Sequence, residues 1–232
     1  MTEHWDAEAE RWARVARDPE WDHHFWRFNM PRFLELAPPP GRATLDVGCG
    51  EGRLGRLLVE RGHRVTGIEA SPTLATLARD GHEVVEADAA DLPFPDGSFD
   101  LAVAFMSLIN MERLDRAVAE VARVLEPGGR FCIAVVHPIR STGEFDDGVF
   151  RATRTYFDRH DLVYDVERDG TTFTFHDVHR PLEAYSRALE NAGLLIEAIR
   201  EPVPDPPHIA DRPRMERWLR VPLFLHLRAR KP

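Results

Sequence analysis

The sequence predicts one domain of the α/β class, in which a doubly wound parallel sheet is covered by helices on both faces. Short apolar runs of strand length alternate with helical segments between residues 41 and 136, and such alternation is typical of parallel strands joined by crossover helices. The chain has 232 residues, which is enough for one well-packed domain and short for two. We therefore expect a single domain over residues 1–232.

The N-terminal segment, residues 1–40, is expected to be helical. Helix-forming residues run from Trp5 to Leu36 around an aromatic-rich middle, WDHHFWRFNM. The helical pattern ends at three prolines followed by Gly41, because proline lacks the N–H that a continuing helix needs. We interpret residues 1–40 as a helical lid on the sheet that follows.

Residues 41–136 are predicted to form the core of the sheet. The helix that begins at Pro72 has Ser71 as an N-cap and proline in its first turn, a favoured start for a helix. The strand of Phe99–Ala104 has little polar alternation, as expected when both faces of a sheet are covered. The predicted helices are Leu54–Arg61, Pro72–Arg79 and Met111–Leu125. The predicted strands are Thr44–Val47, Arg64–Ile68, Glu83–Ala87, Phe99–Ala104 and Arg130–Val136.

The alternation of strands and helices stops after Pro138. Residues 137–180 carry scattered turn residues, and a hairpin is expected around Asp169 and Gly170. We interpret this segment as an insert on the substrate side of the domain. The remaining residues, 181–232, are predicted to close the domain with a helix, Pro181–Asn191, and two strands, Leu194–Arg200 and Val221–Arg228.

Composition and charge argue against several classes of protein. The formal net charge of −9 disfavours general affinity for nucleic acid, and we interpret the basic stretch from Arg212 to Lys231 as solvated surface. No run of about 18 apolar residues predicts a membrane span, and the acidic start is unlike a secretory signal. The two cysteines, Cys49 and Cys132, fall in segments predicted to be buried, which favours a reduced, cytoplasmic setting.

The strongest motif is LDVGCGEGR at residues 45–53, where three glycines directly follow a buried strand. In a doubly wound sheet, ligands bind beyond the carboxyl ends of the strands, and glycines allow the backbone to approach them closely. The dinucleotide fingerprint G-x-G-x-x-G would need a glycine at position 53. The sequence has Arg53 there and places the glycine one residue earlier, at Gly52. This spacing counts against a nucleotide-dependent oxidoreductase, which stays as a less favoured alternative.

Carboxylates stand at the ends of the first three predicted strands. Asp46 lies two residues before the first glycine, where it could anchor the turn or a cation of a ligand. Glu69 follows about twenty residues later, at the place where a carboxylate accepts hydrogen bonds from ribose hydroxyls. Asp88 ends the third strand, where it could meet the exocyclic amine of a base. Together these positions favour a ligand that contains a nucleoside.

Four motifs occur in one order along the chain: LDVGCGEG, TGIEAS with Glu69, EADAADLPFPDGSFD with Asp88, and RVLEPGGRF. They resemble the class I S-adenosylmethionine-dependent methyltransferases, most closely the small-molecule and quinone-biosynthesis subgroup, over roughly residues 44–136. The resemblance implies a Rossmann-like, seven-stranded sheet whose last strand is antiparallel. It also implies S-adenosylmethionine as the cofactor, S-adenosylhomocysteine as the product, and a small molecule methylated at oxygen, nitrogen or carbon.

The resemblance further implies roles for individual residues. Glu69 would hold the ribose diol, with Ala70 beside the adenine, and Asp88 with Ala89 would recognise the adenine amine. Met106 would pack near the adenosine or the sulfonium. Because the sulfur and the amino group of this cofactor are positively charged, a pocket rich in carboxylates suits it. The methionine end of the cofactor would be lined by Asp46, Gly48, Cys49 and Gly50.

The acceptor side is less defined by the sequence. Methyl transfer is an in-line displacement, so a general base is needed only if the acceptor must lose a proton. His137, at the end of the fifth strand, and Tyr156, in the insert, are our candidate catalytic residues. Three questions stay open: the acceptor, the choice between monomer and homodimer, and whether the chain binds the cofactor without catalysis. We predict no metal site, because the acidic and histidine residues of the insert match no known ligand pattern: Glu144, Asp146, Asp147, His176 and His179.

Overall fold

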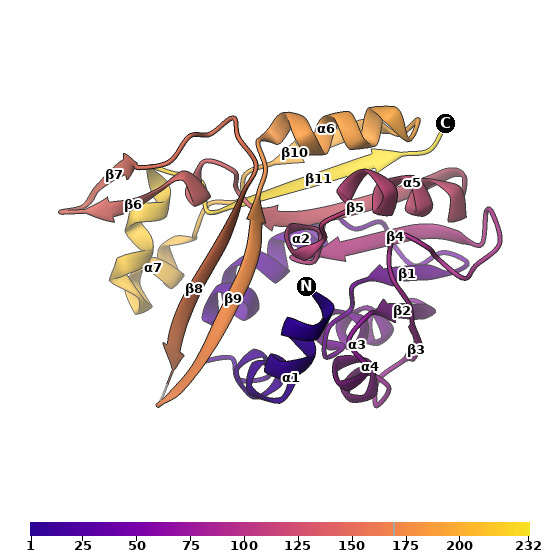
Figure 1. Cartoon of the computed structure of the whole chain (residues 1–232), viewed down its shortest axis with the longest axis horizontal. Helices are drawn as coiled ribbons and strands as arrows, with labels where there is room; N and C mark the ends of the chain where they lie inside the picture. The colour runs from indigo at the N-terminus through magenta and orange to yellow at the C-terminus, as the bar shows by residue number, and fades with distance from the viewer. Residues whose placement is uncertain (169) are drawn as a thin grey trace.

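The computed structural model describes residues 1–168 and 170–232 and has a seven-stranded sheet at its centre (Figure 1). The strand order is β10-β11-β5-β4-β1-β2-β3. The strands of this sheet are β1 (Thr44–Val47), β2 (Val65–Glu69), β3 (Glu83–Glu86), β4 (Phe99–Phe105), β5 (Leu125–Val136), β10 (Leu195–Arg200) and β11 (Phe224–Arg230).

The pairing of the strands agrees with the predicted fold class. Strand β1 is parallel to β2 and β4, β2 is parallel to β3, and β4 is parallel to β5. The last strand, β11, is antiparallel to both of its neighbours, β5 and β10. The predicted seven-stranded sheet with an antiparallel last strand is therefore confirmed. Strand order reverses between β1 and β4, which is the place where ligands bind in doubly wound sheets.

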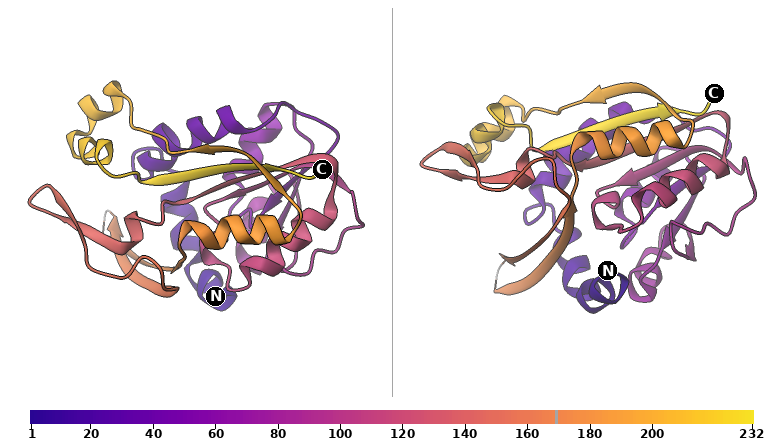
Figure 2. Two further views of the ribbon diagram at one scale, coloured as in Figure 1. Left: turned by 90° about the horizontal axis from the view of Figure 1, so that it is seen from above. Right: turned by 45° about the horizontal axis from the view of Figure 1, so that its top comes forward.

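Helices cover both faces of the sheet, as Figure 2 shows in its left view. Side chains of β4 alternate between the two faces: Ala102 and Ala104 join a core cluster with α5 (Leu114–Val124) and α6 (Leu182–Asn191). Leu101 and Val103 join the opposite cluster. That cluster also holds buried residues of two helices on the other face, α2 (Met30–Leu36) and α3 (Arg53–Glu60).

Most predicted elements of the core are observed within three residues of their expected ends. The helix α4 (Pro72–Ala78) begins as predicted, with the Ser71 hydroxyl accepting a hydrogen bond from Leu74 N–H at 3.2 Å. Strand β5 is the exception, since it begins at Leu125 and not at Arg130. Its pairing with β4 shifts in register between those two residues, so the Pro-Gly-Gly sequence interrupts the strand without ending it.

The N-terminal segment is helical but is broken into pieces. Helix α1 (Thr2–Ala16) ends before Pro19, and a π-helical turn (Phe25–Asn29) leads into α2. Asp18 accepts a hydrogen bond from Glu20 N–H at 2.8 Å, which stabilises the turn at the break. The single helical stretch expected from Trp5 to Leu36 is thus corrected to two helices with a bend between them, because proline cannot continue the first.

The insert contains two antiparallel hairpins and is more regular than its sequence predicts. They are formed by β6 (Gly143–Asp146) with β7 (Val149–Ala152), and by β8 (His160–Arg168) with β9 (Thr171–His179). The second pair confirms the expected hairpin, although Asp169 itself lies outside the described residues. This long hairpin stands away from the central sheet (Figure 2) and contacts α1 through aromatic rings, for example Trp12 against Phe175 at 5.6 Å.

The segment between the two closing strands also has structure that the sequence did not predict. The proline-rich loop after β10 continues into a short helix, α7 (Pro206–Asp211), at whose start the Asp205 side chain accepts a hydrogen bond from His208 N–H at 2.9 Å. In residues 1–168 and 170–232, no helix has both the length and the apolarity needed to cross a bilayer.

Candidate active site

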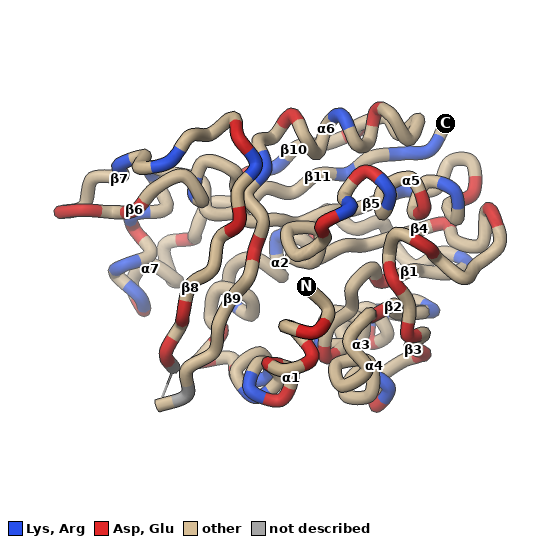
Figure 3. The backbone as a smooth tube through the Cα atoms, viewed as in Figure 1, with Lys and Arg blue, Asp and Glu red and all other residues tan. Residues whose placement is uncertain are grey.

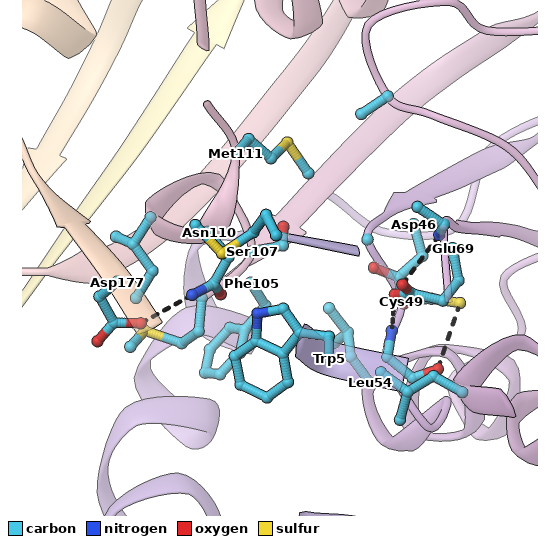
Figure 4. A pocket seen from close by; sticks show the side chains of 18 of the residues that line it. Trp5, Asp46, Cys49, Leu54, Glu69, Phe105, Ser107, Asn110, Met111 and Asp177 are labelled. Atoms are coloured by element: carbon cyan, nitrogen blue, oxygen red, sulfur yellow. Dashed lines mark hydrogen bonds between the residues drawn. The ribbon is translucent and has the colours of Figure 1, made fainter. Parts of the chain in front are cut away.

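A cavity of about 430 Å³ lies at the carboxyl ends of β1 to β4. Its walls include the residues that follow each of these strands, which is where ligands bind in this class of sheet. The close view of Figure 4 shows it lined by polar side chains at both sides of the view and by aromatic rings between them. All nine residues that the sequence assigned to a cofactor line this one cavity: Asp46, Gly48, Cys49, Gly50, Glu69, Ala70, Asp88, Ala89 and Met106.

The glycine turn needs its glycines for two separate reasons. Gly48, Gly50 and Gly52 all have positive φ angles, of 69°, 58° and 89°, which side chains other than hydrogen rarely permit. A Cβ on Gly48 would lie 2.7 Å from Ser107 Cβ, and one on Gly52 would lie 2.9 Å from Ala78 Cα. A Cβ on Gly50 would meet nothing within 4 Å. The backbone at Gly50 therefore borders open space in the cavity.

Asp46 is buried beneath this turn, and its Oδ2 atom has no hydrogen-bond partner among the described residues. Burial, together with the neighbouring charge of Glu69, raises the pKa of Asp46 to about 8. An unsatisfied buried acceptor costs about 1 to 3 kcal/mol. A cationic or N–H group of a bound ligand would satisfy this oxygen, so the site fits a positively charged cofactor.

Glu69 has a structural task besides the one predicted for it. Its Oε2 accepts a hydrogen bond from Gly50 N–H at 2.9 Å, and its Oε1 accepts from Ala70 N–H at 2.9 Å and from Ser71 N–H at 3.0 Å. Burial raises the pKa of Glu69, while these three donors act in the opposite direction. The carboxylate thus holds the glycine turn against the end of β2, and Glu69 also lines the cavity.

Asp88 and Met106 complete the predicted cofactor side. Asp88 lies at the rim, where Oδ1 accepts from Ala90 N–H at 2.8 Å and Oδ2 lies 2.6 Å from Arg113 Nη2. Met106 follows β4 with a φ of 59°, an uncommon angle for a residue with a side chain. Its N–H donates to Ala134 O at 2.8 Å, which holds the strained residue at the strand end. Such strain often marks a functional site.

The two predicted catalytic residues do not line the cavity. His137 Nε2 lies 3.0 Å from Glu201 Oε1, and its Nδ1 accepts from Ile139 N–H at 3.1 Å, so the ring fastens the end of β5 to the segment after β10. Tyr156 Oη accepts from Leu182 N–H at 3.1 Å and so caps the start of α6. We therefore withdraw both as candidate bases, because each side chain is committed to contacts away from the site.

The structure brings to the cavity a polar group that the sequence did not single out. Asp177 on β9 is 6% exposed; its Oδ1 accepts from Asn110 Nδ2 at 2.7 Å and its Oδ2 accepts from Tyr164 Oη at 3.0 Å. Burial raises the pKa of Asp177, against the effect of these two hydrogen bonds. Alternation along β9 places residues 173, 175, 177 and 179 on one face. Phe175 and Asp177, which share this face, both line the cavity. The alternation was therefore the signal in the sequence that could have placed Asp177 beside Phe175.

The N-terminal segment forms another part of the wall, with Trp5 and Trp12 of α1 facing the cavity. Asp6 docks α1 on the start of α4, accepting from Ser71 Oγ at 2.6 Å and from Thr73 N–H at 2.9 Å. These contacts place aromatic side chains from residues 1–40 over the strand ends.

Comparison with known proteins agrees with this geometry. Residues 45–133 match a family model described as "Methyltransferase domain". The ubiquinone/menaquinone biosynthesis C-methyltransferase UbiE of Brucella abortus is 35% identical over 121 residues, which cover 47% of this chain and 45% of the relative. The sterol 4-C-methyltransferase strm-1 of Caenorhabditis elegans is 33% identical over 111 residues, or 44% of this chain and 32% of the relative. The chain thus spans less than half the length of these curated relatives.

Solved structures are similar over nearly the whole chain. An S-adenosylmethionine-dependent methyltransferase from Mesorhizobium loti has a TM-score of 0.73 and 26% identity, covering 94% of this chain and 100% of that one. The [4+2]-cyclase SpnF has a TM-score of 0.67 and 23% identity, covering 100% of this chain and 94% of that one, which shows the fold alone.

In its fold, in the cavity at its strand ends and in these similarities, the chain resembles the class I S-adenosylmethionine-dependent methyltransferases. The part of the chain that matches the methyltransferase family model, residues 45–133, runs from the first strand of the sheet into the fifth.

Proposed function

We propose that this chain binds S-adenosylmethionine and transfers its methyl group to a small-molecule acceptor held in the same cavity. One observation carries the proposal: the nine residues assigned to the cofactor come from four strand ends and line one cavity. In the cofactor the methyl group is attached to a positively charged sulfur, so it is already activated for transfer. The residues of the chain then have to bind the cofactor and the acceptor, orient them for transfer and shield them from water.

The arrangement of polar groups supports this assignment. The free Oδ2 of Asp46 would accept hydrogen bonds from the ammonium of the methionine end, which would remove the cost of the unsatisfied atom. Glu69, already held by three backbone N–H groups, would accept from the ribose hydroxyls. Gly50, with open space beside it, would let the backbone lie against the ligand. Asp88, on the rim, would accept from the adenine amine.

The acceptor would be held by the other half of the cavity. A volume of about 430 Å³ for cofactor and acceptor together suits a small molecule, since ligand pockets in general range from about 300 to 1,000 Å³. Side chains of α1 cover the strand ends and would exclude water, and close alignment of the two reactants supplies much of the rate. In this proposal residues 1–40 act as the lid, 41–136 as the cofactor-binding core, 137–180 as the substrate-side insert and 181–232 as the closing part of one domain.

We also propose that nucleic acid and membranes are not partners of this chain, that it works in the cytoplasm, and that it acts as a monomer or homodimer. Outside the basic stretch from Arg212 to Lys231, Lys and Arg are interspersed with Asp and Glu in the part of the chain that the structure describes (Figure 3), and the formal net charge is −9. Both features disfavour binding to a polyanion. The two cysteines are free and buried, which suits a reduced compartment.

Titration with S-adenosylhomocysteine tests the cofactor assignment. We expect the wild-type chain to bind this product in the micromolar range and Glu69→Ala to bind it at least about tenfold more weakly, a difference of about 1.4 kcal/mol. Glu86→Ala is the matched control, because Glu86 stands opposite Glu69 in the β2–β3 register and is exposed outside the cavity. Absence of binding at millimolar concentration would overturn the proposal, and equal affinity in Glu69→Ala would remove the ribose assignment.

A second function, cofactor binding without methyl transfer, is favoured by one comparison. The fold is shared with a protein named as a [4+2]-cyclase, so the fold by itself does not specify the reaction. Formation of S-adenosylhomocysteine from S-adenosylmethionine, dependent on an added acceptor, separates the two functions. A chain that binds the cofactor and yields no product with any acceptor would be a binding protein. The oxidoreductase alternative has lost its support, since Arg53 occupies the position of the third glycine.

A further inference from the structure

The cavity has a second polar end that the cofactor assignment leaves unused. Figure 4 shows Asp46 and Glu69 on one side of the view and Asp177 with Asn110 on the other, with the indole of Trp5 between them. Asp177 is 6% exposed and belongs to the insert hairpin. Trp5 Nε1 is buried and has no hydrogen-bond partner among the described residues. These two polar groups line the cavity at the end away from Asp46 and Glu69.

Among the described residues, no arginine or lysine pairs with Asp177. The arginines that line the cavity are committed elsewhere: Arg53 is paired with Asp22 at 2.6 Å, and Arg113 with Asp88 at 2.6 Å. No ion pair among the described residues includes Asp177, whose two hydrogen-bond donors, Asn110 and Tyr164, are both neutral.

Two histidines lie near Asp177, and both have other contacts. His4 Nε2 is 2.9 Å from Thr174 O, and His176 Nε2 is 3.9 Å from Asp161 Oδ2. A buried carboxylate without a counter-charge is costly, and a cation supplied by a ligand would offset that cost. In the proposed function the ammonium of the cofactor is matched at the opposite end by Asp46, so it does not supply this cation.

The walls next to Asp177 suit an organic cation. Phe175 stacks on Tyr164 with ring centroids 5.2 Å apart and meets Trp5 edge-on at 6.1 Å. Aromatic faces beside a carboxylate attract a positively charged group and accept flat apolar surface at the same time. A hydroxyl would gain only the hydrogen bond that it donates to Asp177. An ammonium would gain that hydrogen bond and also the attraction between its positive charge and the carboxylate.

We propose that Asp177, positioned by Asn110 and Tyr164, binds a protonated amino group of the methyl acceptor, so that the acceptor is an organic amine with a flat apolar body. This inference rests on the proposed function, because it assigns the acceptor half of the same cavity. Asp177 acts here as a binding residue that orients the acceptor, and the atom that is methylated is a separate matter.

Three indole compounds that differ only in their side-chain end test the proposal on the wild-type chain saturated with S-adenosylhomocysteine. Tryptamine carries an ammonium, tryptophol a hydroxyl and N-acetyltryptamine a neutral amide. We expect tryptamine to bind at least tenfold more tightly than either neutral compound, by calorimetry at pH 7. Equal or weaker binding of tryptamine, or no binding of it at all, overturns the amine assignment. This comparison needs no variant, so it decides the matter even if a substitution disturbs folding.

Two variants then assign the preference to a residue. Asp177→Asn keeps the shape of the side chain and removes its charge, and should bind tryptamine and tryptophol equally. Asp165→Asn, on the exposed face of the same hairpin, is the matched control and should keep the wild-type preference. A preference retained in Asp177→Asn would overturn the role of Asp177. Failure of the wild-type chain to bind S-adenosylhomocysteine would instead overturn the proposed function, so the two failures are distinguishable.

Discussion

The guanidinium of Arg53 ties the glycine turn to the N-terminal segment, with Nη1 2.6 Å from Asp22 Oδ2. The same nitrogen donates to Ala16 O at 3.1 Å, and the group lies over the ring of Phe25 at 3.5 Å from its centroid. Arg53 opens the first helix after the cofactor turn, while Asp22 and Ala16 belong to residues 1–40. One side chain therefore links the proposed cofactor seat to the proposed lid.

Replacing Arg53 with methionine should loosen the N-terminal segment over the cavity. The substitution removes two hydrogen bonds from a charged group, together worth about 1 to 3 kcal/mol, and keeps most of the apolar stem. We expect affinity for S-adenosylhomocysteine to fall about tenfold and amide exchange in α1 to accelerate. Arg187→Met, which breaks an exposed ion pair with Glu183 on α6, is the control. Unchanged exchange in α1 would show that other contacts hold the lid.

Alanine substitutions at two neighbouring glycines should separate stability from binding. Gly52→Ala would place a methyl group 2.9 Å from Ala78 Cα at a φ of 89°, so we expect the free energy of unfolding to fall by about 2 to 3 kcal/mol. In Gly50→Ala the added methyl group would have no neighbour within 4 Å. The free energy of unfolding should fall only by the cost of holding alanine in the left-handed conformation, about 1 kcal/mol. Its methyl group would, however, occupy the cavity.

Gly50→Ala should therefore fold nearly as well as the wild-type chain and bind S-adenosylhomocysteine at least about tenfold more weakly. Chemical denaturation and calorimetry measure the two effects. If the two variants lose stability equally, the contact with Ala78 is not what requires a glycine at position 52.

The substitution Asp88→Asn tests whether Asp88 recognises the adenine base of the cofactor. A carboxylate accepts hydrogen bonds from the amine of adenine and repels the carbonyl oxygen that hypoxanthine has in its place. We expect the wild-type chain to prefer S-adenosylhomocysteine over S-inosylhomocysteine, and Asp88→Asn to lose most of that preference because an amide can also donate. Arg113→Ala should keep the preference, since the Arg113–Asp88 pair is more than half exposed on both sides and so contributes little. A preference unaltered in Asp88→Asn would assign base recognition elsewhere.

His226 should make the stability of the fold depend on pH. The ring is fully buried in β11, where Nε2 pairs with Asn29 Oδ1 at 2.6 Å and Nδ1 has no partner among the described residues. Burial lowers the pKa of His226 from 6.5 to about 4, so the unfolded chain binds this proton first. The contribution of the neutral ring to the free energy of unfolding is complete above pH 6.5. It is lost as the pH falls toward 4, and the total loss is up to about 3 kcal/mol.

His226→Gln can keep a hydrogen bond to Asn29 and has no group that titrates in this range. We expect the free energy of unfolding of this variant to decline less steeply than that of the wild-type chain between pH 6.5 and 4, by up to about 1.4 kcal/mol per pH unit. Denaturation curves at several pH values measure the slopes. Parallel slopes would mean that this histidine is protonated in the folded chain.

The cofactor side of the cavity could be predicted because its geometry is local. Gly48, Glu69 and Asp88 lie at or just beyond the ends of three short strands, and parallel strands bring their carboxyl ends to one edge of the sheet. Once the alternation of strands and helices is recognised, the place of these residues depends on nothing further along the chain.

The acceptor side could not be predicted in this way. Asn110 and Asp177 are 67 residues apart, and they meet only because the insert hairpin returns to the sheet edge. Period-two alternation in β9 indicates which residues share a face and does not indicate what that face packs against. His137 shows the opposite error: it follows a strand as the cofactor residues do, but its contact with Glu201 holds it away from the cavity.

The sequence by itself determined the class of fold, the succession of the core strands along the chain and nine residues that line one cavity at the strand ends. These follow from hydrophobic periodicity, glycine conformation and residue spacing, which act over a few neighbouring residues. Only the tertiary structure decided that Arg53 ties down the N-terminal segment, that His137 and Tyr156 form polar contacts outside the cavity, and that Asp177 lines it. Those outcomes depend on side chains from distant segments competing for the same partners, and no local pattern encodes that competition.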